Sequence, residues 1–239
     1  MLEGSRSRGG VSSEQMLRWC TGAARGLDHL HAAGFAHLDV KPANLLLGDG
    51  GAEVKLADFG TAQTKADSIG GNAVINATPR YAAPERLSGL AHDVFAADVY
   101  SYAMVVYFVT HGQPPFAGAS AEEVLQLIQD SPDDRPPLDD ELSAAAPSVL
   151  ITVMRRCWDA DPNARLGMDV VASTLAGGAD ATVPIARQSG GLAVAAVVCC
   201  GLLFCSFVGF FCCCGSCCPF LHCGTVEVDG TVAKGCVLD

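Results

Sequence analysis

Basic residues are scarce in this sequence. Lysine and arginine number 15 against 26 aspartate and glutamate residues, which gives a formal net charge of −11. Proteins that bind nucleic acid neutralise its phosphates with a basic face. The shortage of basic residues therefore argues against nucleic acid as a partner.

Cysteine is nearly absent from the first 198 residues, where Cys20 and Cys157 stand alone, and the other ten of the twelve cysteines fall between Cys199 and Cys236. A disulfide scaffold would distribute cysteine pairs through the fold. The main domain is therefore predicted to be intracellular and reduced. Residues 1–13 also lack an apolar stretch, so we expect a flexible N-terminus and no secretory signal peptide there.

Charge is missing from the segment 192–214, LAVAAVVCCGLLFCSFVGFFCCC. A helix of about 23 residues, rising about 1.5 Å per residue, spans about 35 Å, which is enough to cross the hydrocarbon core of a bilayer. We predict a single transmembrane helix here. Gly201, Cys205 and Gly209 recur every fourth residue, a stripe on which two such helices could self-associate, although chance explains this spacing equally well in a segment rich in small residues.

Cysteines crowd the stretch that ends this segment, CCCGSCC at 212–218. Three interpretations stay open: palmitoylation if this end faces the cytosol, disulfides if it faces a lumen, and a zinc site formed by Cys214, Cys217, His222 and Cys223. Beyond the cluster the sequence is mostly polar. We therefore divide this part of the chain into a linker at 177–191, the transmembrane helix at 192–214, and a cysteine-containing tail at 215–239.

Helical periodicity is abundant between residues 14 and 176. Ser12 begins a Ser-x-x-Gln capping box with Gln15, and apolar residues from Met16 to Leu30 recur every three or four positions until Gly34 ends the helix. The helix predicted at 94–110 is apolar on nearly every side and too short for a membrane, which indicates a buried central helix. Further helices are predicted at 120–129, 147–158 and 167–176.

Extended segments are few. Two short strands are predicted at 45–47 and 54–56, joined by the turn GDGG. Residues 60–93 are predicted to form a long loop with one short helical turn, and residues 130–142 an acidic surface loop. The sequence thus predicts a mainly α-helical domain at 14–176 with short β-hairpins.

Four motifs follow one another in this domain: HLDVKPAN at 37–44, DFG at 58–60, APE at 83–85 and DVYSY at 98–102. In this order and at these separations they resemble the second half of a eukaryotic protein kinase, over about residues 13–176. The resemblance implies the C-terminal lobe of the protein-kinase fold, a helical bundle with short β-hairpins that carry the catalytic loop.

The same comparison of motifs narrows the class of kinase. The Lys-Pro pair in HLDVKPAN is typical of serine/threonine kinases. Thr78, in TPRYAAPE, resembles the threonine that contacts the catalytic aspartate and lysine in those enzymes. The segments DVYSYAMVVYFVTHGQPPF and CWDADPNAR resemble the tyrosine-kinase-like branch of the serine/threonine group.

The resemblance implies phosphoryl transfer from ATP to a serine or threonine hydroxyl of a protein substrate, with Mg²⁺ as the cofactor. Asp39 would accept the hydroxyl proton, and Lys41 would place a cation at the transferring phosphate. Asn44 and Asp58 would be the oxygen ligands of Mg²⁺. Leu46 resembles the residue beneath the adenine ring. Because ATP and Mg²⁺ are cytosolic, we expect this domain on the cytosolic side of the membrane.

Other matches imply structural roles. His37 and Phe59 resemble the apolar spine elements of the family. Asp98 resembles the buried acceptor that holds the backbone of the catalytic loop. Glu85 and Arg165 resemble the buried ion pair that fixes the activation segment.

The first departure from the family pattern is Leu38, which replaces an arginine that pairs with a phosphate on the activation loop in many members. A phosphate at Thr61, Thr64 or Ser68 would lack this bidentate partner. We therefore expect the phosphorylation switch to be lost and the catalytic chemistry to be retained.

The second departure is that the sequence contains no G-x-G-x-x-G motif and no strand lysine to follow it, so we expect these residues alone to bind ATP poorly. Three interpretations follow: a fragment of a membrane-anchored kinase, a catalytically inactive pseudokinase that acts as a membrane-tethered binding module, or a complex in which another polypeptide supplies the upper lobe. Retention of Asp39, Lys41, Asn44 and Asp58 together favours descent from an active enzyme, and we prefer the first interpretation.

Overall fold

The structure of the chain is a computed structural model that describes residues 11–64, 78–88, 93–178, 221–228 and 231–238. The chain divides into two compact units, Met1–Arg187 and Gln188–Asp239. The predicted transmembrane helix, the Cys212–Cys218 cluster and all but the first two residues of the predicted linker lie outside the described residues. The larger unit contains all four sequence motifs.

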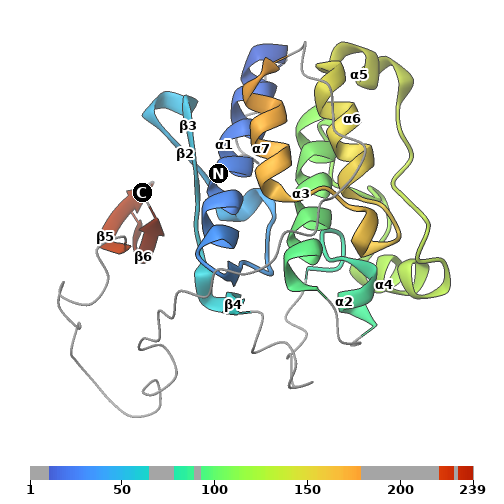
Figure 1. Cartoon of the computed structure of the whole chain (residues 1–239), viewed down its shortest axis with the longest axis horizontal. Helices are drawn as coiled ribbons and strands as arrows, with labels where there is room; N and C mark the ends of the chain where they lie inside the picture. The colour runs from blue at the N-terminus through green and yellow to red at the C-terminus, as the bar shows by residue number, and fades with distance from the viewer. Residues whose placement is uncertain (1–10, 65–77, 89–92, 179–220, 229–230, 239) are drawn as a thin grey trace. The chain divides into compact units, whose positions relative to one another are not determined.

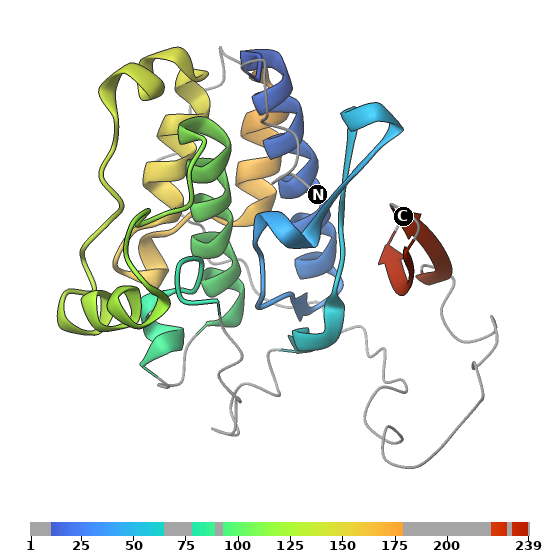
Figure 2. The ribbon, with the colours of Figure 1, turned by 180° about the vertical axis from the view of Figure 1, so that it is seen from behind.

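Four helices form the bundle of the larger unit: α1 (Ser13–Ala32), α3 (Val94–His111), α6 (Ser148–Cys157) and α7 (Met168–Ala176). α1 packs against α7 and α3, and α3 also packs against α6 (Figures 1 and 2). The predicted helices match these elements within a few residues. A mainly helical fold is therefore confirmed for the described part of this unit.

Helix α3 is the centre of the core. Every one of its residues except Phe95 is buried. It begins where the Asp93 carboxylate accepts hydrogen bonds from the backbone N–H groups of Phe95 and Ala96, and it ends at Gly112, which has a φ of 74°. Among the described residues it is the one helix long and apolar enough to cross a membrane, and its burial makes it the predicted core helix.

A hairpin of β2 (Leu45–Gly48) and β3 (Glu53–Leu56) follows the predicted catalytic loop. It packs against α1, as both views show (Figures 1 and 2). Two glycines of α1 permit this contact, because a Cβ at Gly22 would lie 3.1 Å from the Cβ of Val54, and one at Gly26 would lie 3.1 Å from Leu56 Cδ1. The absence of side chains at these two positions therefore lets the hairpin pack close to the backbone of the helix.

Two side chains of α1 hold the tip of the hairpin. Trp19 Nε1 and Gln15 Nε2 donate to the same carbonyl oxygen, that of Gly51, at 2.8 and 2.7 Å. The predicted capping box is half realised, because the Ser12 hydroxyl accepts the backbone N–H of Gln15 at 3.2 Å, as expected. The Gln15 side chain does not complete the box, since it reaches the hairpin.

A second pair of strands connects the segment before HLDVKPAN to the segment after DFG. β1 (Phe35–Ala36) pairs antiparallel with β4 (Gln63–Thr64), with Phe35 opposite Thr64. No strand is predicted from the sequence at either place, because two residues are too few to show an alternating pattern. The pairing joins the residues just before HLDVKPAN to those just after DFG.

Three shorter helices complete the larger unit: α2 (Pro84–Leu87), α4 (Ala121–Asp130) and α5 (Asp140–Ala145). α2 is the helical turn predicted within 60–93, and α4 matches its prediction. The prediction of a loop at 130–142 is wrong at its end. There the Asp139 carboxylate accepts the backbone N–H of Leu142 and so caps α5.

The smaller unit contains one described element, an antiparallel hairpin of β5 (Leu221–Val228) and β6 (Thr231–Leu238), in which Leu221 lies opposite Leu238. No regular structure is predicted from the sequence for the tail at 215–239. Its prediction is therefore incomplete, because the tail includes two eight-residue strands.

Candidate active site

The predicted catalytic loop, 37–44, is suspended from helix α3 by one carboxylate. Asp98 is fully buried, and it accepts the backbone N–H of His37 at 2.6 Å and that of Leu38 at 2.7 Å. His31 on α1 adds a third contact, with Nε2 2.9 Å from Asp98 Oδ2. Asp98 thus holds the backbone of the loop from α3, and charge-assisted bonds of this kind are strong when buried.

Asp39 lies at the centre of a polar cluster. Its Oδ2 is 2.6 Å from Lys41 Nζ and accepts a hydrogen bond from Asn44 Nδ2 at 3.0 Å. Its Oδ1 accepts the Thr78 hydroxyl at 3.1 Å, and Lys41 Nζ in turn donates to that hydroxyl at 3.2 Å. Four of the predicted site residues are therefore in direct contact, although Thr78 is 39 positions from Asp39.

The side chain of Asn44 leaves an oxygen for a ligand. Its Nδ2 donates both to the Asp39 carboxylate and to the Asp39 backbone carbonyl, the latter at 2.8 Å. Because both bonds go to acceptors, the amide nitrogen is fixed there and Oδ1 is the atom available to a cation. Among the described residues no group of three or more His, Cys, Asp or Glu could hold a metal ion.

Asp58 lies outside the hydrogen-bonded cluster of Asp39, Lys41, Asn44 and Thr78. It is exposed, with a left-handed backbone (φ 63°), and it precedes the 3-10 turn Phe59–Thr61. An exposed carboxylate can take up a hard cation without the cost of breaking a buried contact.

Three other predicted residues lie in the loop or beside it. His37 is fully buried, its Nε2 lies 3.0 Å from the Ala57 carbonyl, and its ring centroid lies 5.2 Å from that of Phe59. Leu46 lies in β2 opposite Lys55 and is half-buried. His37 and Phe59 are thus neighbours, and Leu46 is on the hairpin beside the loop.

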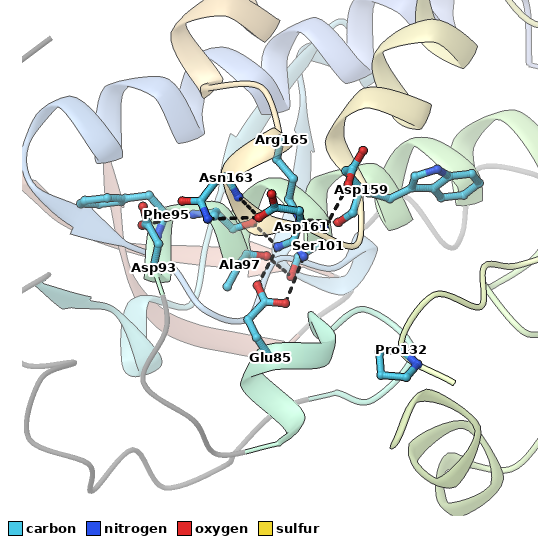
Figure 3. A network of polar contacts seen from close by, with 12 residues as sticks. Glu85, Asp93, Phe95, Ala97, Ser101, Pro132, Asp159, Asp161, Asn163 and Arg165 are labelled. Atoms are coloured by element: carbon cyan, nitrogen blue, oxygen red, sulfur yellow. Dashed lines mark hydrogen bonds and ion pairs between the residues drawn. The ribbon is translucent and has the colours of Figure 1, made fainter. Parts of the chain in front are cut away.

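Arg165 is 1% exposed, and acceptors from three segments surround its guanidinium. Its guanidinium forms a bidentate pair with Glu85, at 2.6 and 3.0 Å, and also donates to the carbonyls of Ala96 (2.9 Å) and Asp159 (2.8 Å). Figure 3 shows Arg165 reaching Glu85 on α2 from the loop before α7. The ion pair suggested by the resemblance is thus in contact, and it ties α2 to the bundle.

Leu38 is 3% exposed, packs in the core, and has a left-handed backbone with a φ of 66°. Thr61, one of the predicted phosphorylation positions, donates its hydroxyl to the His37 carbonyl at 2.9 Å. The hydroxyl is therefore already used to hold the catalytic loop. Ser68, another of these positions, lies outside the described residues.

Sequence reasoning missed three side chains of this region. His31 contacts Asp98, Arg80 donates to the carbonyls of Pro115 (3.0 Å) and Phe116 (2.6 Å), and Arg86 donates to the carbonyl of Leu38. Bonds from a side chain to a distant backbone carbonyl leave no spacing pattern in a sequence. The one available signal was the clustering of two arginines around the APE motif.

A family model described as protein kinase domain matches residues 2–175. Serine/threonine-protein kinase PkaA of Streptomyces coelicolor is 39% identical over 139 residues, which cover 56% of this chain and 24% of that protein. Serine/threonine/tyrosine-protein kinase HT1 of Arabidopsis thaliana is 33% identical over 157 residues, 65% of this chain and 38% of that protein.

Receptor-interacting serine/threonine-protein kinase 1 of Homo sapiens is 34% identical over 154 residues, which cover 59% of this chain and 22% of that protein. The chain therefore spans between 22% and 38% of the length of these three relatives. The residues matched by the family model fall within the larger unit, where the polar cluster around Asp39 lies.

Proposed function

Because the chain belongs to the protein kinase family, we propose that it transfers the γ-phosphoryl group of ATP to serine and threonine hydroxyls of proteins. The observation that carries the proposal is the contact of Asp39 with Lys41, Asn44 and Thr78. The names of the relatives support a serine/threonine kinase, and the threonine in the cluster supports the same class.

In the proposed reaction the oxygen of the substrate hydroxyl attacks the γ-phosphorus, the bond from that phosphorus to the β–γ bridging oxygen breaks, and ADP leaves. Asp39 accepts the proton of the hydroxyl. Its carboxylate is held on both oxygens, by Thr78 on one and by Lys41 and Asn44 on the other, so it does not reorient when the substrate arrives. Lys41 supplies positive charge beside the transferring group.

ATP and a divalent cation follow from the family, and we propose Mg²⁺ as that cation. Asn44 Oδ1 and the Asp58 carboxylate are the atoms that would hold it. When bound, Mg²⁺ neutralises the charge of the phosphate oxygens. We expect EDTA to abolish transfer, and Asp58→Asn to raise the Mg²⁺ concentration needed for half-maximal transfer. An unchanged Mg²⁺ requirement in Asp58→Asn would contradict the assignment of this ligand.

The test of the proposed function is transfer of labelled phosphate from ATP by the full chain, inserted in lipid nanodiscs, to a panel of proteins and peptides. Because these residues alone are expected to bind ATP poorly, we expect slow transfer, with phosphoserine and phosphothreonine as products. Asp39→Asn should abolish transfer, and Asp133→Asn, the same change at an exposed position, should not. Products dominated by phosphotyrosine would contradict the proposed substrate class.

A non-catalytic role is the alternative, and the absence of a G-x-G-x-x-G motif from the sequence favours it. A pseudokinase would act as a membrane-tethered binding module. In that case the wild-type chain and Asp39→Asn would both fail to transfer phosphate and would capture the same partner proteins from solution.

We also propose that segment 192–214 anchors the kinase domain to a membrane, with the domain on the cytosolic side. The uncharged run of membrane length supports this. The full chain should float with liposomes through a density gradient, and a variant with Leu203→Lys and Phe207→Lys should not. In cells, protease added to the cytosolic side should digest the domain.

If the stripe of Gly201, Cys205 and Gly209 mediates self-association, Gly209→Leu should lower the yield of cross-linked dimer.

A further inference from the structure

Arg86 is a charged residue placed where solvent hardly reaches. It lies in α2, one position after Glu85, and is 9% exposed. Its guanidinium donates a hydrogen bond to the backbone carbonyl of Leu38, which precedes it by 48 positions. Burying a guanidinium costs free energy unless acceptors surround it, and the Leu38 carbonyl in the catalytic loop is one such acceptor.

The residue that Arg86 contacts has an uncommon backbone. Leu38 has a φ of 66°, a left-handed conformation that side chains larger than glycine rarely adopt. Its N–H is held by Asp98 on α3 at 2.7 Å, and its C=O is held by Arg86 on α2. Two ionic side chains from two helices therefore fix both polar groups of the residue that immediately precedes Asp39.

The charges around Arg86 match this role. Burial lowers the pKa of Arg86, and the nearby carboxylates of Asp98 and Asp39 act in the opposite direction by favouring the charged form. The guanidinium thus lies in the field of both acids that organise the loop. Leu38 itself adds no charge, since its side chain is a hydrocarbon that packs in the apolar core.

We propose that Arg86 is a positioning residue for the phosphoryl-transfer site. From α2 it holds the carbonyl of the left-handed Leu38, and it thereby fixes the orientation of Asp39. The inference rests on the proposed function for its kinetic consequence and on geometry alone for its structural one. It gives the chain a cation at the catalytic loop that comes from the segment after APE and not from HLDVKPAN itself.

The test compares the full chain with Arg86→Met and Arg86→Lys in nanodiscs. Arg86→Met should speed amide hydrogen exchange in residues 37–44 about tenfold and leave α6 and α7 unchanged. It should also lower kcat about tenfold, with the KM for the protein substrate nearly constant, because Arg86 acts through Asp39 and does not touch the substrate. Arg86→Lys should restore part of both properties.

Arg80→Met is the matched control. It removes a guanidinium from the same segment, but the Arg80 guanidinium donates to other carbonyls, those of Pro115 and Phe116. It should leave the exchange of residues 37–44 unchanged. The proposal is overturned if Arg86→Met leaves that exchange within about twofold of wild type, or raises it equally in α6 and α7. If Arg86→Met does not fold, the same comparison is made with Arg86→Lys and Arg86→Gln. If the wild-type chain transfers no phosphate, the proposed function fails and the exchange data alone decide the role of Arg86.

Discussion

Asp39 depends for its orientation on groups that reach it from different segments of the chain. Lys41 and Asn44 belong to its own loop, and Thr78 comes from the segment before APE. The Thr78 hydroxyl is both an acceptor for Lys41 and a donor to Asp39, so it fixes the distance between the two charges. The residue has this bridging role because a hydroxyl can donate and accept at once.

Thr78→Val removes the bridging hydroxyl and keeps the shape of the side chain. We expect kcat for phosphoryl transfer to fall about tenfold, because Asp39 and Lys41 lose a shared partner, while the thermal midpoint changes little. Thr78→Ser, which keeps the hydroxyl, is the control and should retain most of the activity. Equal rates for Thr78→Val and wild type would show that the bridge has no catalytic role.

The two cysteines of the larger unit should be unreactive while the chain is folded. Both are fully buried; burial raises the pKa of Cys20 from its ordinary 9.0 to about 12 and raises that of Cys157 as well. The thiolate is the reactive form. Alkylation at pH 8 followed by peptide mass spectrometry should label neither residue in the native chain and both in urea.

The same shifts predict how stability depends on pH. Above pH 9 the unfolded chain loses protons from thiols that the folded chain keeps, so the free energy of unfolding should decrease as the pH rises from about 9 towards 12. Urea titrations in this range measure the effect. Replacing both cysteines by alanine should reduce the slope, and an unchanged slope would contradict the assignment.

At the scale of elements, the contact between α1 and the β2–β3 hairpin is set by Gly22 and Gly26. Gly22→Val should lower the free energy of unfolding by about 1–3 kcal/mol, because a branched side chain has no space beneath Val54. Arg25→Val, at an exposed position of the same helix, is the control for helix propensity and should cost about 0.5 kcal/mol. Val54→Ala in the Gly22→Val background should recover part of the loss, measured by urea unfolding.

The success of the sequence predictions also differed between elements. Long helices with clear periodicity, such as α1 and α3, were predicted within a few residues, because burial of one face or of all faces imposes a pattern. The two-residue strands β1 and β4 and the six-residue helix α5 were missed. Such short elements show no repeated pattern in the sequence. β1 and β4 are stabilised by pairing with each other, and α5 by its Asp139 cap.

The candidate site could be predicted as far as its motifs extend. The structure brings Asp39, Lys41, Asn44 and Thr78 together and places Asp98 under the loop. The contacts that support these residues from other segments could not be predicted. His31, Arg80 and Arg86 act through bonds to residues more than 30 positions away, and the energy of such a bond depends on burial that only the fold creates.

At the scale of the whole molecule, Glu85 and Arg165 join α2 to the bundle. Arg165→Met should destabilise the chain by about 3–5 kcal/mol, because it leaves the Glu85 carboxylate unpaired and removes the donors to Ala96 and Asp159. A double-mutant cycle with Glu85→Gln, followed by urea unfolding, measures the coupling. The double variant should be more stable than the sum of the two single changes predicts, and strict additivity would contradict a direct pair.

The polar contacts of the site also set the order in which it can appear during synthesis. His37 and Leu38 bind a carboxylate that follows them by 61 and 60 positions, and Glu85 binds a guanidinium 80 positions later. A nascent chain on the ribosome therefore exposes Asp39, Lys41 and Asn44 long before α3 or Arg165 has emerged. Until then Asp39 lacks its contact with Thr78 and the loop lacks its support from Asp98, so we expect the proposed activity only after most of the larger unit has left the exit tunnel.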